Sequence, residues 1–240
     1  VTEPASVATF QRLAREAITD IWGRGRVPGL AGGSGLYARA VIDRLEFPGT
    51  DAAVRSRLEA DAQSSGSAAL HRRLALLDPE AAAAILPTNT RRVVRALEVI
   101  EITGRPFSAT LPRRDYWHTP TVQVAIDVAR SELDRRVEAR VEHMWAAGLV
   151  EEVRELVTRG LRDAPTASKA LGYAHVLRYV AGECTEEQAR TQTVAATRRF
   201  VRRQDQWFRR DPRVRWMLPP IDATAVAGWA RGEVPDPASR

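Results

Sequence analysis

The residues best suited to chemistry are the arginines near the carboxyl end of the chain. Between residues 198 and 215 the sequence places eight arginines against two aspartates, with aromatic side chains among them. On a helix, Arg198, Arg202 and Arg209 would lie beside an apolar stripe, and a row of guanidinium groups suits a phosphate backbone. A solvated charged face is the commoner fate of such a run. The scarcity of acids in the run and the net charge of +6 favour nucleic-acid binding.

A glycine-rich turn at Gly33-Ser34-Gly35 is the second chemical feature. Its letters match the dinucleotide fingerprint, but no second strand ending in an acid follows, which excludes a nicotinamide site. A hydrolase nucleophile elbow fails as well, because Leu36 stands where its last glycine belongs. Such a turn exposes backbone N–H groups and the Ser34 hydroxyl to an anion. A tight turn without a ligand explains the residues about equally well.

Two arginines on a later helix form a third candidate. Arg136 and Arg140 lie one helical turn apart, so their guanidinium groups can converge on one anion. Ion pairing with Glu132, Asp134 or Glu138 is equally well spaced. The residues alone slightly favour the ion pairs.

The start of another helix carries unopposed positive charge. Asn89 or Thr90 can cap this helix, and Arg91, Arg92 and Arg95 lie on its first turns. Cations at a helix N-terminus oppose the helix dipole, which costs stability unless an anion binds there. This segment is therefore the second nucleic-acid candidate.

A shorter candidate begins at Ser168, a possible helix cap that Lys169 follows. Gly172 and Tyr173 lie one turn further on. The segment could place Lys169 on a phosphate, or it could be a packed helix start.

The composition describes a folded, basic protein. The 240 residues are 44% hydrophobic and 28% charged, and Lys169 is the single lysine among 36 basic residues. One cysteine, Cys184, excludes an internal disulfide and a cysteine-based metal site, and the four histidines show no metal-ligand spacing. No apolar run approaches the ~20 residues of a membrane span. We expect a cytoplasmic protein with no metal ligands in this chain.

The periodicity indicates an α/β core that is interrupted by helices. Strands are expected at 27–31 and 122–128, with no strand pattern between them. The expected domains are part of the core at 1–40, an all-helical insertion at 41–119, the resumed core with its basic helix at 120–220, and a helix and tail at 221–240. Helices are expected at 6–21, 51–62, 67–77, 79–85, 89–103, 131–148, 150–159, 169–181, 185–209 and 223–231.

Two strands are too few for a buried parallel sheet, because both faces of such a sheet need cover. We therefore expect further strands outside this sequence. The chain also opens at Val1, with no methionine, and enters a helix capped by Ser6 almost at once. Both features predict that an amino-terminal part is missing.

Six motifs in order resemble one family, the bacterial tRNA dimethylallyltransferases (the tRNA isopentenyltransferase family). They run from Ala5 to about Leu218, and six in order are far more specific than any one. The motifs are ASVATFQ (5–11), GGSGLY (32–37), RVVRALE (92–98) with TGRPF (103–107), R-x3-R-x3-M-x3-GL (136–149), ALGY (170–173) and RQDQWFRR (203–210).

The resemblance implies a P-loop-type α/β core, predominantly helical in this chain, with a helical domain that grips the tRNA anticodon stem-loop. It implies transfer of a dimethylallyl group from dimethylallyl diphosphate to N6 of the adenosine 3′-adjacent to the anticodon, with Mg²⁺, by a monomer. Ser34, Arg136 and Arg140 would lie at the diphosphate end. The implied tRNA contacts are Asn89, Thr90, Arg91, Arg92, Val93, Arg95, Lys169, Ala170, Leu171, Gly172, Tyr173, Arg202, Arg203, Gln204, Asp205, Gln206, Trp207, Phe208 and Arg209.

Some family features are absent or altered here. The P-loop and the Asp-Ser motif that supplies the general base have no counterpart, so these 240 residues alone are predicted to be inactive. Ala174 and Lys169 stand where the family usually has arginine, and Asp205 is less favourable than a neutral or basic residue. A non-catalytic RNA-binding module of the same family is the alternative. A P-loop kinase for small molecules is a distant third, because it would leave the basic helix without a purpose.

Overall fold

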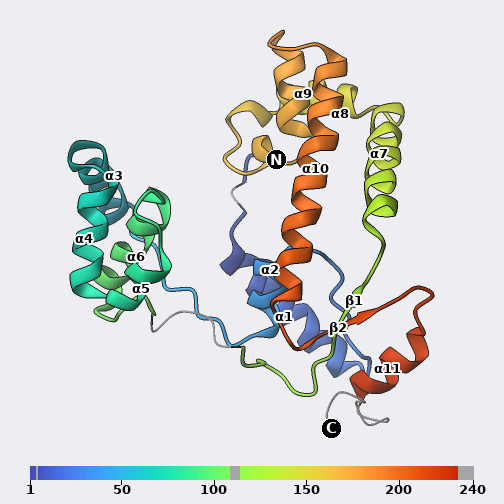
Figure 1. Cartoon of the computed structure of the whole chain (residues 1–240), viewed down its shortest axis with the longest axis horizontal. Helices are drawn as coiled ribbons and strands as arrows, with labels where there is room; N and C mark the ends of the chain where they lie inside the picture. The colour runs from blue at the N-terminus through green and yellow to red at the C-terminus, as the bar shows by residue number, and fades with distance from the viewer. Residues whose placement is uncertain (4, 109–113, 232–240) are drawn as a thin grey trace. The chain divides into compact units, whose positions relative to one another are not determined.

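The computed structural model describes residues 1–3, 5–108 and 114–231 (Figure 1). These residues are predominantly helical and include a small parallel sheet. None of the described helices is both long and apolar enough to cross a membrane.

The chain divides into two compact units. One joins residues 1–41 to the chain from His118 onward, and the other comprises residues 42–117. The predicted insertion, residues 41–119, encloses the second unit. Each unit has its own buried apolar core.

The sheet of the first unit corrects the predicted strands. β1, Gln123–Ile126, pairs in parallel with β2, Val214–Met217. The strand predicted at 27–31 is wrong, since these described residues join no ladder and Pro28 has no N–H to donate to one. β2 was missed because its four residues are too few to show a period and lie within the arginine-rich run.

The first helix, α1, follows its prediction. α1 spans Val7–Gly23, and the Ser6 hydroxyl accepts a hydrogen bond from the Thr9 N–H at 3.1 Å. This bond satisfies one of the N–H groups that have no partner within the helix.

α2, Gly35–Ile42, begins within the glycine-rich turn and ends against α1. Arg15 of α1 donates to the carbonyl oxygens of Ala40 at 3.1 Å and Val41 at 3.2 Å. These carbonyls close the last turn of α2 and lack helical partners, so Arg15 serves as the cap of α2 from outside.

Helices α7 to α10 of the first unit pack around a core of their own. α7 and α10 lie side by side (Figure 1), and α9 also packs against α10. Val141, Val153 and Val176, from three different helices, are almost fully buried in this core. These helices are α7 (Arg130–Ala146), α8 (Leu149–Thr158), α9 (Tyr173–Val180) and α10 (Glu186–Arg209). α11 (Ala223–Arg231) follows β2 and contributes no residue to this core.

The start of α9 differs from its prediction. A 3₁₀ turn at Ala167–Lys169 precedes the helix, and the Ser168 hydroxyl donates to the Ala164 carbonyl at 2.6 Å instead of capping α9. Gly172 has a φ of +92°, which an L side chain rarely adopts, so the helix begins only after it.

The described residues of the second unit form a bundle of four helices. Leu58, Leu74 and Leu97 are almost fully buried between them. A left-handed Gly104 ends the last helix, as expected of a C-cap. The helices are α3 (Ala52–Ser65), α4 (Ser67–Leu77), α5 (Pro79–Ala84) and α6 (Thr90–Thr103).

A buried carboxylate ties this bundle together. Glu98 of α6 is fully buried and accepts hydrogen bonds from Arg55 at 2.6 Å, Arg95 at 2.8 Å and the Asp51 N–H at 3.1 Å. Burial alone would raise the pKa of Glu98, but the bonds from Arg55, Arg95 and the Asp51 N–H lower it below its usual value. Glu98 is therefore held as a carboxylate between two cations.

Candidate anion and nucleic-acid binding site

The glycine-rich turn lies directly against α10. A Cβ atom on Gly33 would come within 2.3 Å of the Gln204 Nε2 atom, and one on Gly35 within 2.1 Å of the Trp207 Cδ1 atom. A Cβ on Gly35 would collide with the indole ring, so packing requires glycine there, whereas Gly33 meets only the flexible end of the Gln204 side chain. The contact joins two segments that are far apart in the sequence, the GGSGLY and RQDQWFRR motifs.

Ser34 lies between these two glycines and opens α2. Its carbonyl accepts the Ala38 N–H at 2.9 Å, and its side chain is exposed. No hydrogen bond joins the Ser34 hydroxyl to another residue that the structure describes. The hydroxyl and the first N–H groups of α2 can therefore donate to an anion, as the turn predicts.

Three of the arginines on α10 are held by acidic residues of the same unit, the first being Arg190 with Glu142 and Glu186. Arg198 pairs with Glu138 on α7, and Arg209 donates to Asp127 at 2.8 Å and to Asp205 at 2.9 Å. The Arg209 guanidinium also lies 4.0 Å from the Trp216 ring centroid. Its contacts join α10 to the end of β1 and to β2, which is a structural use of a residue predicted to bind tRNA.

Three other arginines of α10 form an exposed basic face, which we define as Arg199, Arg202 and Arg203. No ion pair joins them to any residue within the described ranges. The Arg203 guanidinium lies 5.9 Å from the Phe200 ring centroid, a contact that leaves its N–H donors free. This basic face remains available to phosphate groups.

The arginines of α7 likewise include some that are ion-paired and one, Arg140, that is not. Arg136 donates to Glu132 at 2.7 Å, and Arg135 pairs with the same carboxylate. Hydrogen bonding to Arg136, then the charge of Arg135, lowers the pKa of Glu132. Arg140 is exposed and has no ion pair with another described residue. The ion-pair interpretation thus holds for Arg136 and does not hold for Arg140.

The segment before α9 exposes Lys169 and Leu171. The Tyr173 hydroxyl donates to Glu152, and this hydrogen bond, with burial, raises the pKa of Tyr173. Gly172 packs near Met144, which lies against the core of the first unit.

The first two arginines of α6 are exposed, whereas the residues that follow are buried or paired. Asn89 caps the helix by accepting the Arg92 N–H at 3.3 Å, and the Arg91 and Arg92 side chains are exposed. Arg95 is instead bound to Glu98 and to the Pro48 carbonyl at 2.6 Å. The adjacent Val93 is fully buried, so its side chain packs in the core of the helical unit and cannot contact tRNA.

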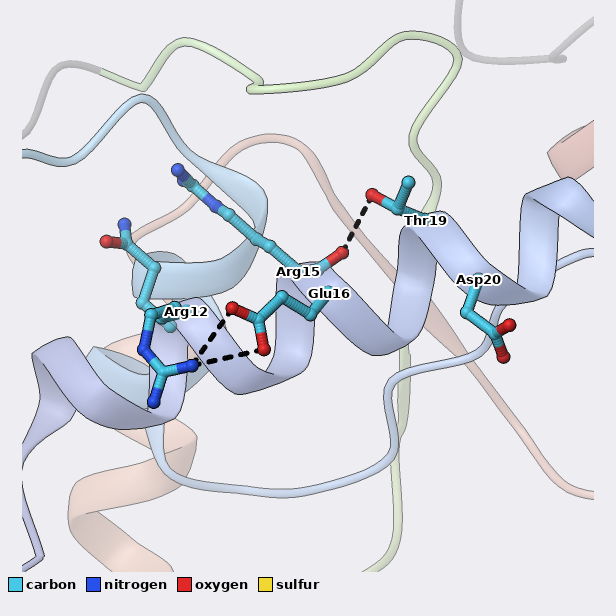
Figure 2. A pocket seen from close by; sticks show the side chains of 6 residues that line it. Arg12, Arg15, Glu16, Thr19 and Asp20 are labelled. Carbon is cyan, nitrogen blue, oxygen red and sulfur yellow. Dashed lines mark hydrogen bonds and ion pairs between the residues drawn. The ribbon is translucent and has the colours of Figure 1, made fainter.

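An open hollow of about 620 Å³ lies along α1 (Figure 2). Its lining side chains include Arg12, Arg15, Glu16 and Asp20, and Arg12 pairs with Glu16 at 2.9 Å. Because the lining mixes both signs of charge and its groups are largely paired, it offers no selective attraction for a diphosphate. The candidate binding features are the glycine-rich turn with the part of α10 that contacts it, and, separately, the exposed arginines of α7 and α10.

Metal ligands do not cluster in the parts of the chain that the structure describes. No group of three or more His, Cys, Asp or Glu residues there could hold a metal ion. A Mg²⁺ ion held by protein carboxylates does not fit these residues, whereas Mg²⁺ bound mainly through substrate phosphates needs few protein ligands.

The contact between the glycine-rich turn and α10 was not predicted. Gln204 and Trp207 were interpreted as tRNA contacts, and only their spacing on one face of α10 hinted at a shared neighbour. The capping box of Thr185 and Gln188 at the start of α10 was also missed, although its T-x-x-Q spacing is a recognised signal.

Comparison with known proteins identifies relatives along most of the chain. The family model for IPP transferase (IPPT) matches residues 1–211. A tRNA dimethylallyltransferase from Thermobifida fusca (strain YX) is 62% identical over 223 residues, which cover 93% of this chain and 69% of that protein.

Solved structures match as well. The full-length tRNA isopentenylpyrophosphate transferase from Bacillus halodurans is 37% identical with a TM-score of 0.63, and the match covers 97% of this chain and 76% of that one. A eukaryotic dimethylallyltransferase, described as acting on tRNA, has a TM-score of 0.77 at 20% identity, with 94% of this chain and 61% of that chain covered. At 20% identity, the match to the eukaryotic enzyme supports a shared fold only.

Proposed function

Because the chain belongs to the IPP transferase family, we propose that it takes part in tRNA modification, as a prenyltransferase. The reaction would transfer a dimethylallyl group from dimethylallyl diphosphate to N6 of the adenosine 3′-adjacent to the anticodon. The observation that carries the proposal is the contact between the glycine-rich turn and the basic helix α10. This contact places the turn, the proposed anion site, against the helix that carries the proposed RNA-binding face.

The proposed chemistry asks for donors to the leaving group. A bond forms between adenine N6 and C1 of the prenyl group while the bond from C1 to the diphosphate oxygen breaks, so negative charge gathers on the diphosphate. The Ser34 hydroxyl and the N–H groups that open α2 would donate to it, and Arg140 would supply positive charge. Arg136 would have to exchange Glu132 for the diphosphate, a small cost for an exposed ion pair.

The tRNA would be held at three places. These are the basic face of α10 (Arg199, Arg202 and Arg203), the exposed Arg91 and Arg92 at the start of α6, and Lys169 with its neighbours before α9. Arg95 and Arg209 are better explained as structural residues, because their guanidinium groups already bind carboxylates. The target base would be turned out of its stack to reach the prenyl donor.

Mg²⁺ enters the proposal only with the diphosphate. When bound, it would neutralise part of the charge on the phosphate oxygens. No step above depends on it. A P-loop-like core, a cytoplasmic location and a monomeric state likewise remain proposals that follow from the family.

The 240 residues are proposed to bind tRNA without turnover on their own. They contain no G-x-x-x-x-G-K-[ST] sequence, the phosphate-binding loop that the fold class uses. No residue of this chain is proposed as the base that takes the N6 proton. Transfer of labelled dimethylallyl to tRNA by these residues alone would overturn this part.

A chimaera tests the main proposal whether or not these 240 residues are active on their own. The 223 matching residues of the Thermobifida protein would be replaced by those of this chain, and transfer to tRNA measured with labelled dimethylallyl diphosphate. Activity that is lost on Ser34→Ala, and kept on Ser64→Ala as a control for an exposed helical serine, is the expected result. A folded chimaera without any transfer would contradict the proposal.

The competing hypotheses lose support. A non-catalytic RNA-binding module is not favoured, because the relative at 62% identity is named for an enzyme activity. The small-molecule kinase would not need the basic face of α10.

A further inference from the structure

The side chains that touch the glycine-rich turn come from one face of α10. Gln204 meets Gly33, and Trp207, three residues later, meets Gly35. Residues at this spacing lie on the same side of a helix, so they contact the turn as a pair. Ser34 lies between the two contacted glycines.

We propose that Gln204 and Trp207 are positioning residues that hold Ser34 and the first N–H groups of α2 in place for a diphosphate. This inference rests on the proposed function. It assigns the two side chains a role at the turn, although Trp207 is 44% exposed and lies one helical turn after Arg203 of the basic face. One helix would thus position the diphosphate site and carry the RNA surface.

Trp207 makes the stiffer of the two contacts. A Cβ on Gly35 would lie 2.5 Å from the Trp207 Cγ atom, close to the backbone of α10, so the ring cannot easily swing aside. A Cβ on Gly33 would meet the far end of Gln204, which can move at little cost. Gly35→Ala should therefore disturb the turn more than Gly33→Ala.

The first test measures the turn without any ligand. In the wild-type chain the backbone order parameters of Gly33, Ser34 and Gly35 should lie near the rigid value of about 0.85. Trp207→Ala should lower them toward about 0.6 or less, and Trp207→Phe should restore them. Gln206→Ala, an exposed neighbour on α10, is the matched control and should leave these backbone order parameters unchanged. Unchanged order parameters in Trp207→Ala would overturn the proposal.

Gly35→Ala serves as a second variant if Trp207→Ala fails to fold. It keeps the indole and should also loosen or displace the turn, whereas Gly33→Ala should have a smaller effect. Equal effects of the two glycine variants would contradict the proposal.

The second test adds inorganic diphosphate, with affinity measured by calorimetry and the site located by amide chemical shifts. Binding should shift the amides of residues 33–36. Affinity should fall roughly ten- to a hundredfold in Trp207→Ala and recover in Trp207→Phe, as for other residues that orient a binding group. If Trp207→Ala leaves the diphosphate affinity unchanged, the positioning role alone would be overturned. A wild-type chain that binds no diphosphate at the turn would overturn that part of the proposed function, and the positioning role with it.

Discussion

The helices α6 and α10 both carry several arginines, yet they begin with opposite charges. α10 opens with Glu186 and Glu187 behind a capping box, which suits the positive end of the helix dipole. α6 opens with Arg91 and Arg92 and has no acidic residue in its first turn. α10 is thus stabilised at its start, whereas α6 keeps its N-terminus open to an anion at some cost in stability.

The two helices also use their later arginines differently. On α6, Arg95 is drawn inward by the buried Glu98. On α10, the basic face (Arg199, Arg202 and Arg203) meets no acidic partner among the described residues. The same residue type in the same kind of run is structural where a buried carboxylate faces it and available for binding where none does.

The largest expected effect comes from removing Glu98, the buried carboxylate that draws Arg95 inward. Glu98→Ala leaves Arg55 and Arg95 without their shared partner and should cost about 3 kcal/mol, at the lower end for a broken buried pair because both arginines reach solvent. Hydrogen exchange in α3 and α6 measures the helical unit by itself. Glu101→Ala, which removes exposed ion pairs with Arg57 and Arg73, is the control and should cost less than about 1 kcal/mol.

Glu98 also predicts a pH dependence. Its pKa is lowered in the folded protein, so its stabilisation is complete above the unfolded value of 4.5 and is lost as the pH falls through the folded value. The helical unit should therefore lose stability below about pH 4.5, and Glu98→Gln should flatten that loss. If Glu98→Gln loses stability at acid pH as much as the wild-type protein does, other carboxylates control that loss.

A pair of arginine variants should separate the two uses directly. Arg203→Ala should lower the salt slope of tRNA binding by roughly one unit and leave stability nearly unchanged. Arg95→Ala should do the reverse and cost the helical unit about 1–2 kcal/mol, because Glu98 loses a charged hydrogen bond. Filter binding over a range of salt concentrations, together with hydrogen exchange, measures both. A slope that falls equally in both variants would restore Arg95 as a tRNA contact.

The sequence predicted these helices far better than it predicted what their side chains meet. The ends of α4, α6, α10 and α11 lie within one residue of expectation, because capping residues and apolar period are local signals. The role of Arg95 depends on where Glu98 points, and that of Trp207 on a glycine far earlier in the chain. Such long-range contacts leave no periodic trace in one sequence.

The strands show the same limit. β1 was found, but β2 has only four residues and takes its identity from pairing with β1. The run at 27–31 has strand-like composition, yet the described residues offer it no partner strand. Strand formation depends on a neighbour, whereas a helix satisfies its own backbone.

The caps provide a smaller test of the comparison. Asn89→Ala at α6 and Thr185→Ala at α10 should each cost about 1 kcal/mol. Gln188→Ala should add a further loss at α10, because Gln188 Oε1 accepts the hydrogen bond that the Thr185 N–H donates at 2.9 Å. Hydrogen exchange in the first turns of the two helices measures each separately. A larger loss at Asn89 would show that α6 depends on its cap more than its charges suggest.

The smallest effect should be the most telling, since it has opposite signs for stability and binding. Arg91→Glu gives α6 the kind of first turn that α10 has, and it should stabilise the helical unit by about 0.3–1 kcal/mol. The same change should weaken tRNA binding, because it replaces a free cation with an anion at a phosphate-binding end. Arg72→Glu on α4, an exposed arginine of the same unit away from any helix start, controls for net charge. If Arg91→Glu stabilises α6 and leaves tRNA affinity at the level of Arg72→Glu, the arginines at the start of α6 are a tolerated defect and not a binding site.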